Sequence, residues 1–294
     1  MSSIPVPGTL YVVATPIGNL ADLTSRARDT LAAVDVIFAE DTRVTAILLA
    51  HYGIDTPMVS LHEHNEARRS ARVIEKLQQG SSAALVSDAG TPALSDPGAH
   101  LVRAVRASGF PVVAVPGPSA LAAALSIAGV EGPFVFLGFL PARGPGRRKA
   151  LASQLEFAGA LVVYESPHRL RETLTDLREV FGAERAVLIA RELTKRFEMA
   201  ERVPLGDALA WLDADPNRSR GEFVLIVEPS ARLPAERALS AAIDTLDKLL
   251  EELPLAQAVR LAQRITGAPR NPLYQHALAR MRRRDGETDV DGAA

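Results

Sequence analysis

The chain has 294 residues, of which 47% are hydrophobic and 23% are charged, and its formal net charge is −2. This length predicts about two domains with a sizeable core, and no apolar stretch approaches the roughly 20 residues of a membrane span. The absence of cysteine excludes disulfides, thiolate catalysis and sulfur-ligated zinc. Residues 1–8 lack the basic and apolar regions of a signal peptide, so we expect a cytoplasmic protein. The small net charge means that any nucleic-acid partner must be met by a local basic face.

The first half of the chain alternates short apolar runs with amphipathic segments. The apolar runs predict strands at 9–14, 34–39, 58–61, 83–87 and 111–115. The amphipathic segments predict helices at 25–33, 42–51, 65–79, 100–107 and 120–129. This alternation predicts a mostly parallel sheet with helices on both faces.

Gly132 and Pro133 interrupt this alternation and mark a domain boundary. We therefore predict an N-terminal α/β domain over 1–131 and a second α/β domain over 132–230. The second domain is expected to contain strands at 134–139, 160–164, 186–190 and 223–227, and helices at 167–180 and 205–213. Within it, the segment 143–149 (Arg-Gly-Pro-Gly-Arg-Arg-Lys) is predicted to be a mobile basic loop.

The C-terminal part of the chain has a different composition. Residues 229–234 are predicted to be a linker, and residues 235–284 form a helical pattern in which Pro254 and Pro269 mark new helix starts. This region is too short and too rich in Ala and Leu to continue a sheet, so it predicts a small helical module. The polar segment 285–294 is expected to be a disordered tail.

Three loops of the first domain follow strands and are rich in Gly, Pro and polar residues. They are residues 15–20, 87–98 and 116–120. Because the carboxyl ends of parallel strands meet at one edge of a sheet, we expect these loops to converge there. Their acidic groups and backbone N–H groups fit a small cationic ligand with a carboxylate and a ribose. A triphosphate fits less well, because no G-x-x-x-x-G-K-[ST] loop is present and the acids repel phosphate.

Four further polar clusters also follow predicted strands, at residues 40–43, 62–66, 164–169 and 191–198. The first is equally consistent with a simple helix N-cap. In the second, His62 and His64 stand two residues apart, which is a poor spacing for helical metal ligation, so we expect no metal site. Basic groups at 143–149, 169–171, 195–196 and 280–284 are individually typical of solvated surface, but together they predict a phosphate-binding face.

The ordered set of motifs resembles a known family. The segments are 15–20 (Thr-Pro-Ile-Gly-Asn-Leu), 40–43 (Glu-Asp-Thr-Arg), 62–66 (His-Glu-His-Asn-Glu), 87–98, 116–119 (Pro-Gly-Pro-Ser), 164–169 (Tyr-Glu-Ser-Pro-His-Arg), 191–195 (Arg-Glu-Leu-Thr-Lys) and 271–278. They resemble the bacterial ribosomal RNA small subunit methyltransferases I of the tetrapyrrole-methylase superfamily, over nearly the whole chain. The resemblance implies two α/β domains with S-adenosylmethionine folded into the cleft between them. It further implies a homodimer that methylates the 2′-oxygen of a cytidine in the decoding region of 16S rRNA, with either the naked rRNA or the assembled 30S subunit as the substrate.

The resemblance also implies roles for particular residues. The expected cofactor-binding residues are Pro16, Gly18, Asp88, Ala89, Gly90, Thr91, Asp96, Pro116, Gly117, Ser119, Ala120, Tyr164, Glu165, Glu222 and Phe223. A 2′-hydroxyl is a poor nucleophile near neutral pH, so a base or a charge stabiliser is expected to assist. The candidates are Glu40, Asp41, Glu66 and Lys195, with His62 also considered, and the sequence does not choose among them. The expected RNA-binding residues are Arg43, Arg147, Arg148, Lys149, Arg169, Arg196, Arg282 and Arg283.

Two other functions remain open from the sequence. A methyltransferase acting on a small tetrapyrrole shares the fold and cofactor, but it would not need the helical module or the arginine clusters. A non-catalytic, ribosome-associated RNA-binding protein is the alternative from another class, and the retained loops 88–98 and 116–120 argue against it.

Overall fold

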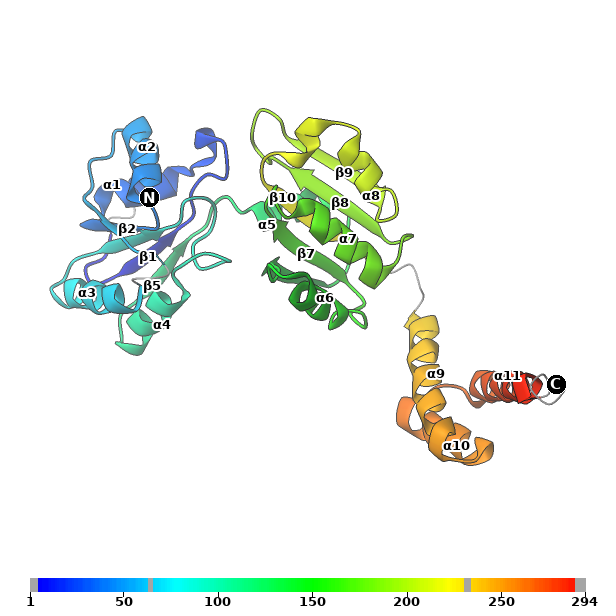
Figure 1. Ribbon diagram of the computed structural model, residues 1–294. Helices are drawn as coiled ribbons and strands as arrows, with labels where there is room; N and C mark the ends of the chain where they lie inside the picture. Colours follow the sequence, from blue (N-terminus) through cyan, green and yellow to red (C-terminus); the bar gives the residue numbers. More distant parts are fainter. Residues whose placement is uncertain (1–4, 63–65, 230–233, 289–294) are drawn as a thin grey trace. The chain divides into compact units, whose positions relative to one another are not determined.

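The computed structural model describes residues 5–62, 66–229 and 234–288, and the side chains within 5–62, 66–229 and 239–280. The chain divides into two compact units, one ending at Pro229 and the other beginning at Ser230. The first unit carries two five-stranded sheets, and the second carries only helices among its described residues (Figure 1).

The first sheet is parallel throughout and has the strand order β3-β2-β4-β1-β5. Its strands are β1 (Leu10–Val13), β2 (Val36–Ala39), β3 (Met58–Ser60), β4 (Ala83–Val86) and β5 (Val112–Val115). Every residue of β2 and β4 is buried, as expected for strands that helices cover on both faces. The mostly parallel sheet predicted from the alternating pattern is therefore present.

Helices cover this sheet on both faces. They are α1 (Ser25–Ala33), α2 (Thr42–Tyr52), α3 (Glu66–Gln78) and α4 (Ala99–Ala107), with a short 3-10 turn, η1 (Leu20–Asp22). One core cluster joins α1 and α2 to the sheet, and a second joins α3 and α4 to its other face. Local capping sets the helix ends: the Thr24 hydroxyl accepts a hydrogen bond from Ala27 N, and Gly53 ends α2 with a φ of 64°.

Helix α5 (Ala120–Ala128) departs from the expected domain boundary. The boundary at 131/132 assigned it to the first domain, but it packs on the second sheet. Ala124 is fully buried in a cluster with Val162, Ala190 and Val224 of that sheet. The helix has small apolar residues on most sides, so its sequence pattern does not reveal which sheet it covers. As a result β5 is left partly uncovered, and Val113 is 40% exposed.

The second sheet is mixed and has the order β6-β7-β10-β8-β9. Its strands are β6 (Phe134–Phe139), β7 (Ala160–Glu165), β8 (Ala186–Arg191), β9 (Met199–Pro204) and β10 (Phe223–Val227). Only β6 and β7 are parallel, and the remaining neighbours are antiparallel. Strand β9 was not predicted from the sequence, because it is an edge strand that contains Glu201 and Arg202 and is largely exposed. The helices of this part are α6 (Gly144–Ala152), α7 (Leu170–Phe181) and α8 (Ala208–Asp213), with the 3-10 turn η2 (Pro216–Ser219).

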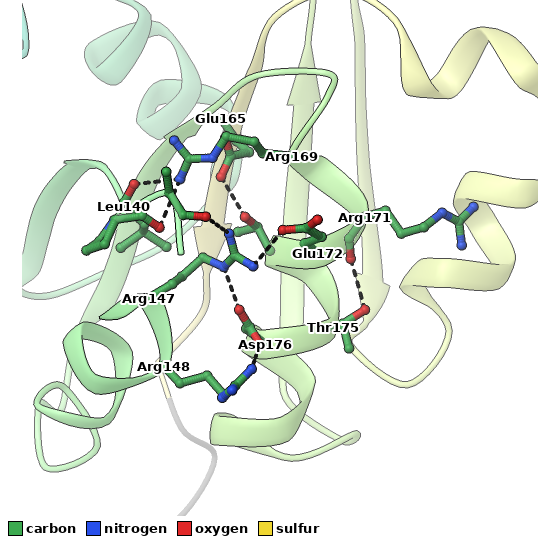
Figure 2. Close-up of polar contacts among 12 residues, drawn as sticks. Leu140, Arg147, Arg148, Glu165, Arg169, Arg171, Glu172, Thr175 and Asp176 are labelled. Atoms are coloured by element: carbon green, nitrogen blue, oxygen red, sulfur yellow. Dashed lines mark hydrogen bonds and ion pairs between the residues drawn. The ribbon is translucent and has the colours of Figure 1, made fainter. Parts of the chain in front are cut away.

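The predicted mobile loop at 143–149 is wrong, because residues 144–152 form α6. Pro145 lies at the start of this helix, where its fixed φ suits the first turn. Contacts with α7 explain why this segment is ordered (Figure 2). Arg147 Nε donates to Asp176 Oδ2 at 2.5 Å, and Arg147 Nη2 donates to Glu172 Oε2 at 3.1 Å; both acceptors lie on α7. The Arg147 side chain is only 2% exposed, so its ion pair with Asp176 is a buried link between α6 and α7.

The C-terminal unit consists of α9 (Pro234–Glu252), α10 (Leu255–Thr266) and α11 (Arg270–Thr288). These helices share a small core that includes Leu246, Val259 and Leu273. Helix α11 extends into the segment predicted to be a tail, and residues 289–294 lie outside the described residues, as does most of the predicted linker. None of the described helices is long and apolar enough to cross a membrane.

Candidate active site

The first unit contains a cavity of about 360 Å³, lined by residues that follow strands of both sheets and by the start of the antiparallel strand β10. Its lining includes ten residues predicted to bind the cofactor: Ala89, Gly90, Thr91, Asp96, Ser119, Ala120, Tyr164, Glu165, Glu222 and Phe223. The lining also includes residues that the sequence analysis did not name for this role: Ile17, Leu94, Phe139, Ser166, Pro167, Leu193 and Val224. Five of the seven lie inside segments singled out from the sequence, so the motifs located them, and they were missed because most are apolar.

Backbone contacts join the loops of the first sheet into one wall. Thr15 N donates to Gly90 O at 2.8 Å, and Gly90 N donates to Thr15 O at 3.0 Å. The Thr91 hydroxyl donates to Pro118 O at 3.2 Å. Gly90 has a φ of +80°, which a side chain other than glycine tolerates poorly. These contacts bring the three predicted loops together, as the parallel topology requires.

Tyr164 links this wall to the second sheet. Its phenolic oxygen accepts a hydrogen bond from Leu121 N, in the first turn of α5, at 2.9 Å. Its ring packs edge-on against Phe136 and Phe139, with centroids 4.8 and 5.8 Å away. Burial raises the pKa of Tyr164, so the phenol stays neutral and can fill this structural role.

Next to Tyr164, the side chain of Glu165 is fully buried, and both of its carboxylate oxygens accept hydrogen bonds. Its Oε1 accepts from Ser166 N at 2.8 Å, and its Oε2 accepts from the Thr173 hydroxyl at 2.6 Å. Arg169 Nε lies 3.5 Å from Oε1, and Figure 2 shows the same guanidinium donating to Leu140 O. Glu165 therefore organises the end of β7 rather than offering a free charge to the cavity.

Carboxylates gather where β2 and β4 end. Glu40 Oε2 accepts from Asp88 N at 3.3 Å, and Asp88 Oδ1 accepts from Asp41 N at 3.0 Å. Burial raises the pKa of Glu40, and the nearby charges of Asp88 and Asp96 raise it further. Burial likewise raises the pKa of Asp96, with a smaller contribution from Asp88. A cation beside these groups would therefore be stabilised, because it would relieve their mutual repulsion.

The four candidate catalytic residues have different environments. Asp41 caps α2 and pairs with Arg43, which lowers its pKa to about 2 and makes it a weak base. Glu66 Oε1 accepts from Gly98 N at 3.1 Å and Leu101 N at 2.8 Å, so it caps the start of α4. This structural use argues against the catalytic role considered for Glu66.

Lys195 lies at the edge of the cavity. Its ammonium donates to Glu222 Oε2 at 2.6 Å and to Glu192 Oε1 at 2.9 Å. A Cβ added to Gly18 would overlap the Lys195 side chain, so the glycine allows the loop after β1 to approach this lysine. Gly18 thus lies against Lys195 instead of lining the cavity.

Pro16, Asp88, Pro116 and Gly117 also lie outside the cavity lining. Asp88 takes part in the carboxylate cluster, and a Cβ on Gly117 would come within 3.1 Å of Ala14 Cβ. Gly117 therefore permits close packing behind the wall. Within the described residues, no group of three or more His, Asp or Glu side chains is placed to hold a metal ion.

The structure separates the predicted RNA-binding residues into two kinds. Arg147 is buried, so it is not exposed to RNA. The guanidinium of Arg169 donates hydrogen bonds to the backbone oxygens of Leu140 and Pro141. Arg148 is 44% exposed and pairs with Asp176, so part of its charge is used internally. The exposed members are Arg43, Lys149 and Arg196, and the side chains of Arg282 and Arg283 lie outside the described part of the chain.

Comparisons with known proteins agree with this architecture. A family model described as tetrapyrrole (corrin/porphyrin) methylases matches residues 9–209, and one described as the RsmI C-terminal HTH domain matches residues 236–281. A ribosomal RNA small subunit methyltransferase I from Pseudomonas aeruginosa is 50% identical over 275 residues, which cover 93% of this chain and 98% of that protein. Its counterpart from Escherichia coli O157:H7 is 49% identical over 272 residues, covering 92% of this chain and 95% of that protein.

Two solved structures share the fold. The cobalt precorrin-4 methyltransferase CbiF has a TM-score of 0.58 at 15% identity, covering 75% of this chain and 95% of that chain. The methyltransferase CobJ has a TM-score of 0.59 at 22% identity, covering 77% of this chain and 97% of that chain. At such low identity the likeness shows the fold alone.

Proposed function

The chain belongs to the tetrapyrrole (corrin/porphyrin) methylase family, and from this premise we propose that it methylates small-subunit ribosomal RNA with S-adenosylmethionine. The observation that carries the proposal is the identity of about half of all residues, over more than nine-tenths of the chain, with relatives named for that activity. The finer proposal is transfer to the 2′-oxygen of a cytidine in the decoding region of 16S rRNA, which follows from the motif resemblance. Such a substrate would place the protein in the cytoplasm.

The cavity fits S-adenosylmethionine by its chemistry. Asp96 supplies a carboxylate to the lining, and Glu40 lies beside it in the same acidic cluster. The close-packed backbone at Gly90 would lie against the ligand, and the rings of Tyr164 and Phe139 supply apolar surface. The bound cofactor would supply an electrophilic methyl group on a cationic sulfonium. These carboxylates attract a cation and repel an anion, so the acidic cluster favours a ligand that carries a positive charge.

Among the candidate catalytic residues, we assign the base to Glu40. Its carboxylate is partly buried, its pKa is raised, and no cation pairs with it among the described residues. A base works best when its pKa lies near the operating pH, so Glu40 is better suited than Asp41. Lys195 is assigned to charge stabilisation, because its ammonium lies at the edge of the cavity.

Two features support the proposed assembly with RNA and with a second copy. The exposed cations Lys149 and Arg196 are available to phosphate, whereas Arg43 is exposed but pairs with Asp41. The C-terminal unit matches a helix-turn-helix model. The partly exposed β5 surface at Val113 supports a homodimer, since α5 leaves that edge uncovered. Light scattering on a size-exclusion column measures the oligomeric state directly.

The deciding experiment is transfer of a radiolabelled methyl group from S-adenosylmethionine to isolated 30S subunits that lack the modification. We expect label in 16S rRNA, at a nucleotide whose 3′ linkage resists alkaline hydrolysis because its 2′-oxygen is blocked. Label on a small tetrapyrrole instead would support the alternative enzyme. No S-adenosylmethionine binding by isothermal titration, together with binding to 30S subunits, would support a non-catalytic RNA-binding protein.

A further inference from the structure

The loop between β8 and β9, residues 192–198, presents an exposed Arg-Phe pair. Phe197 is 63% exposed, although burial of a phenylalanine ring is favourable. The guanidinium carbon of Arg196 lies 5.5 Å from the centroid of the Phe197 ring, in a cation–π contact. Among the described residues, no carboxylate forms an ion pair with Arg196. The pair thus combines an aromatic face with an available positive charge.

Hydrogen bonds hold this loop in a single shape. Thr194 N donates to Glu198 Oε2 at 2.5 Å, and Arg191 Nη1 donates to Phe197 O at 3.3 Å. Glu192 and Thr194 have φ values of 52° and 66°, which are unfavourable for residues other than glycine. Such strained positions persist only where the surroundings enforce them, and they cluster at functional sites. The loop therefore presents the pair rigidly instead of leaving a ring on a flexible turn.

The same loop forms part of the cavity wall. Leu193 lines the cavity, and Lys195 pairs with Glu222, which also lines it. Arg191, which holds the carbonyl of Phe197, lies opposite the cavity residue Phe223 in the β8–β10 register. The exposed pair therefore follows the cavity-lining residue Leu193 by three and four residues in the chain.

We propose that Arg196 and Phe197 form a stacking platform for an unpaired nucleobase of the RNA substrate beside the methyl-transfer cavity. This inference rests on the proposed function and adds the residues that recognise the substrate. Sequence-specific recognition of RNA targets unpaired bases that stack on aromatic rings and arginine planes, and a ribose must leave a regular helix to enter a cavity. One face of the Phe197 ring would take the base, while Arg196 covers the ring and remains near the phosphate.

The first test separates stacking from simple apolar contact. Phe197→Leu keeps an apolar side chain and removes the ring, whereas Phe197→Trp keeps a stacking surface. We expect Phe197→Leu to raise the KM for 30S subunits about tenfold, in the range found for loss of one base–aromatic stack, and Phe197→Trp to retain the wild-type value. The kcat at saturating subunits and the Kd for S-adenosylmethionine should stay unchanged. Phe134→Leu is the matched control, because Phe134 is also exposed, at 47%, but lies at the start of β6.

The second test detects the contact directly. A single-stranded oligoribonucleotide carrying 5-iodouridine is irradiated with the full-length protein, and the cross-linked residue is identified by mass spectrometry. A cross-link at Phe197 supports the platform, and its absence while the RNA is bound overturns it. If the wild-type protein is active and Phe197→Leu has the same KM for 30S subunits, the stacking platform is also overturned. If the wild-type protein transfers no methyl group to 30S subunits, the proposed function fails, and the cross-link alone decides whether Arg196 and Phe197 bind a base.

Discussion

Replacing Arg147 by methionine should cost about 3–5 kcal/mol of the free energy of unfolding. The magnitude follows from burial: the side chains of Arg147 and Asp176 are 2% and 4% exposed, and their closest atoms are 2.5 Å apart. The substitution keeps most of the apolar stem but leaves a buried carboxylate paired only with Arg148. Because about 1 kcal/mol shifts the melting temperature by about 2–4 °C in a unit of this size, we expect a decrease of about 6–20 °C.

The assay is urea unfolding followed by far-UV circular dichroism, with two comparison variants. Arg148→Met removes the other partner of Asp176, but Arg148 is 44% exposed, so its loss should cost less than about 1 kcal/mol. The double variant Arg147→Met with Asp176→Leu removes both buried charges and should recover most of the lost stability. Equal stability of the two single variants would refute the reasoning, as would a double variant no more stable than Arg147→Met.

Three further predictions concern the cavity and the C-terminal unit. Gly90→Val should abolish S-adenosylmethionine binding, measured by isothermal titration, because Gly90 has a φ of +80° and lines the cavity. The circular dichroism spectrum of this variant should stay unchanged. The control is Gly53→Val, which has a similar φ of +64° but open space around it and should bind S-adenosylmethionine normally. Burial raises the pKa of Asp96, so its charge is lost as the pH falls through that raised pKa. Affinity for S-adenosylmethionine should therefore fall toward acidic pH, and Asp96→Asn should weaken this dependence, the remainder coming from Glu40, whose pKa is also raised. S-adenosylhomocysteine, which lacks the sulfonium charge, should show a smaller dependence. A protein ending at Pro229 should melt cooperatively and bind S-adenosylmethionine but methylate 30S subunits poorly; transfer at the full-length rate would mean that the C-terminal unit is only structural.

The local signals in the sequence determined the elements of the first sheet and the edge at which its loops line the cavity. Helix α1 begins and ends where the amphipathic segment predicted, at Ser25 and Ala33. The loops containing Gly90 and Ser119 follow the neighbouring parallel strands β4 and β5 on either side of β1, and parallel topology then requires them to meet. Each of these conclusions depends on neighbours along the chain, so the sequence alone was sufficient.

Contacts between distant residues decided the rest. Arg147 looks like an exposed cation in a Gly-Pro-Gly segment, and only the approach of Asp176, 29 residues later, makes it a buried ion pair. Glu66 looks like a possible catalytic carboxylate until the start of α4 places Leu101 N 2.8 Å from it. Helix α5 follows the first sheet in sequence but covers the second, because the Tyr164 hydroxyl and the small surface at Ala124 hold it there. A side chain's charge is visible in the sequence, whereas the partner that uses that charge is set by tertiary packing.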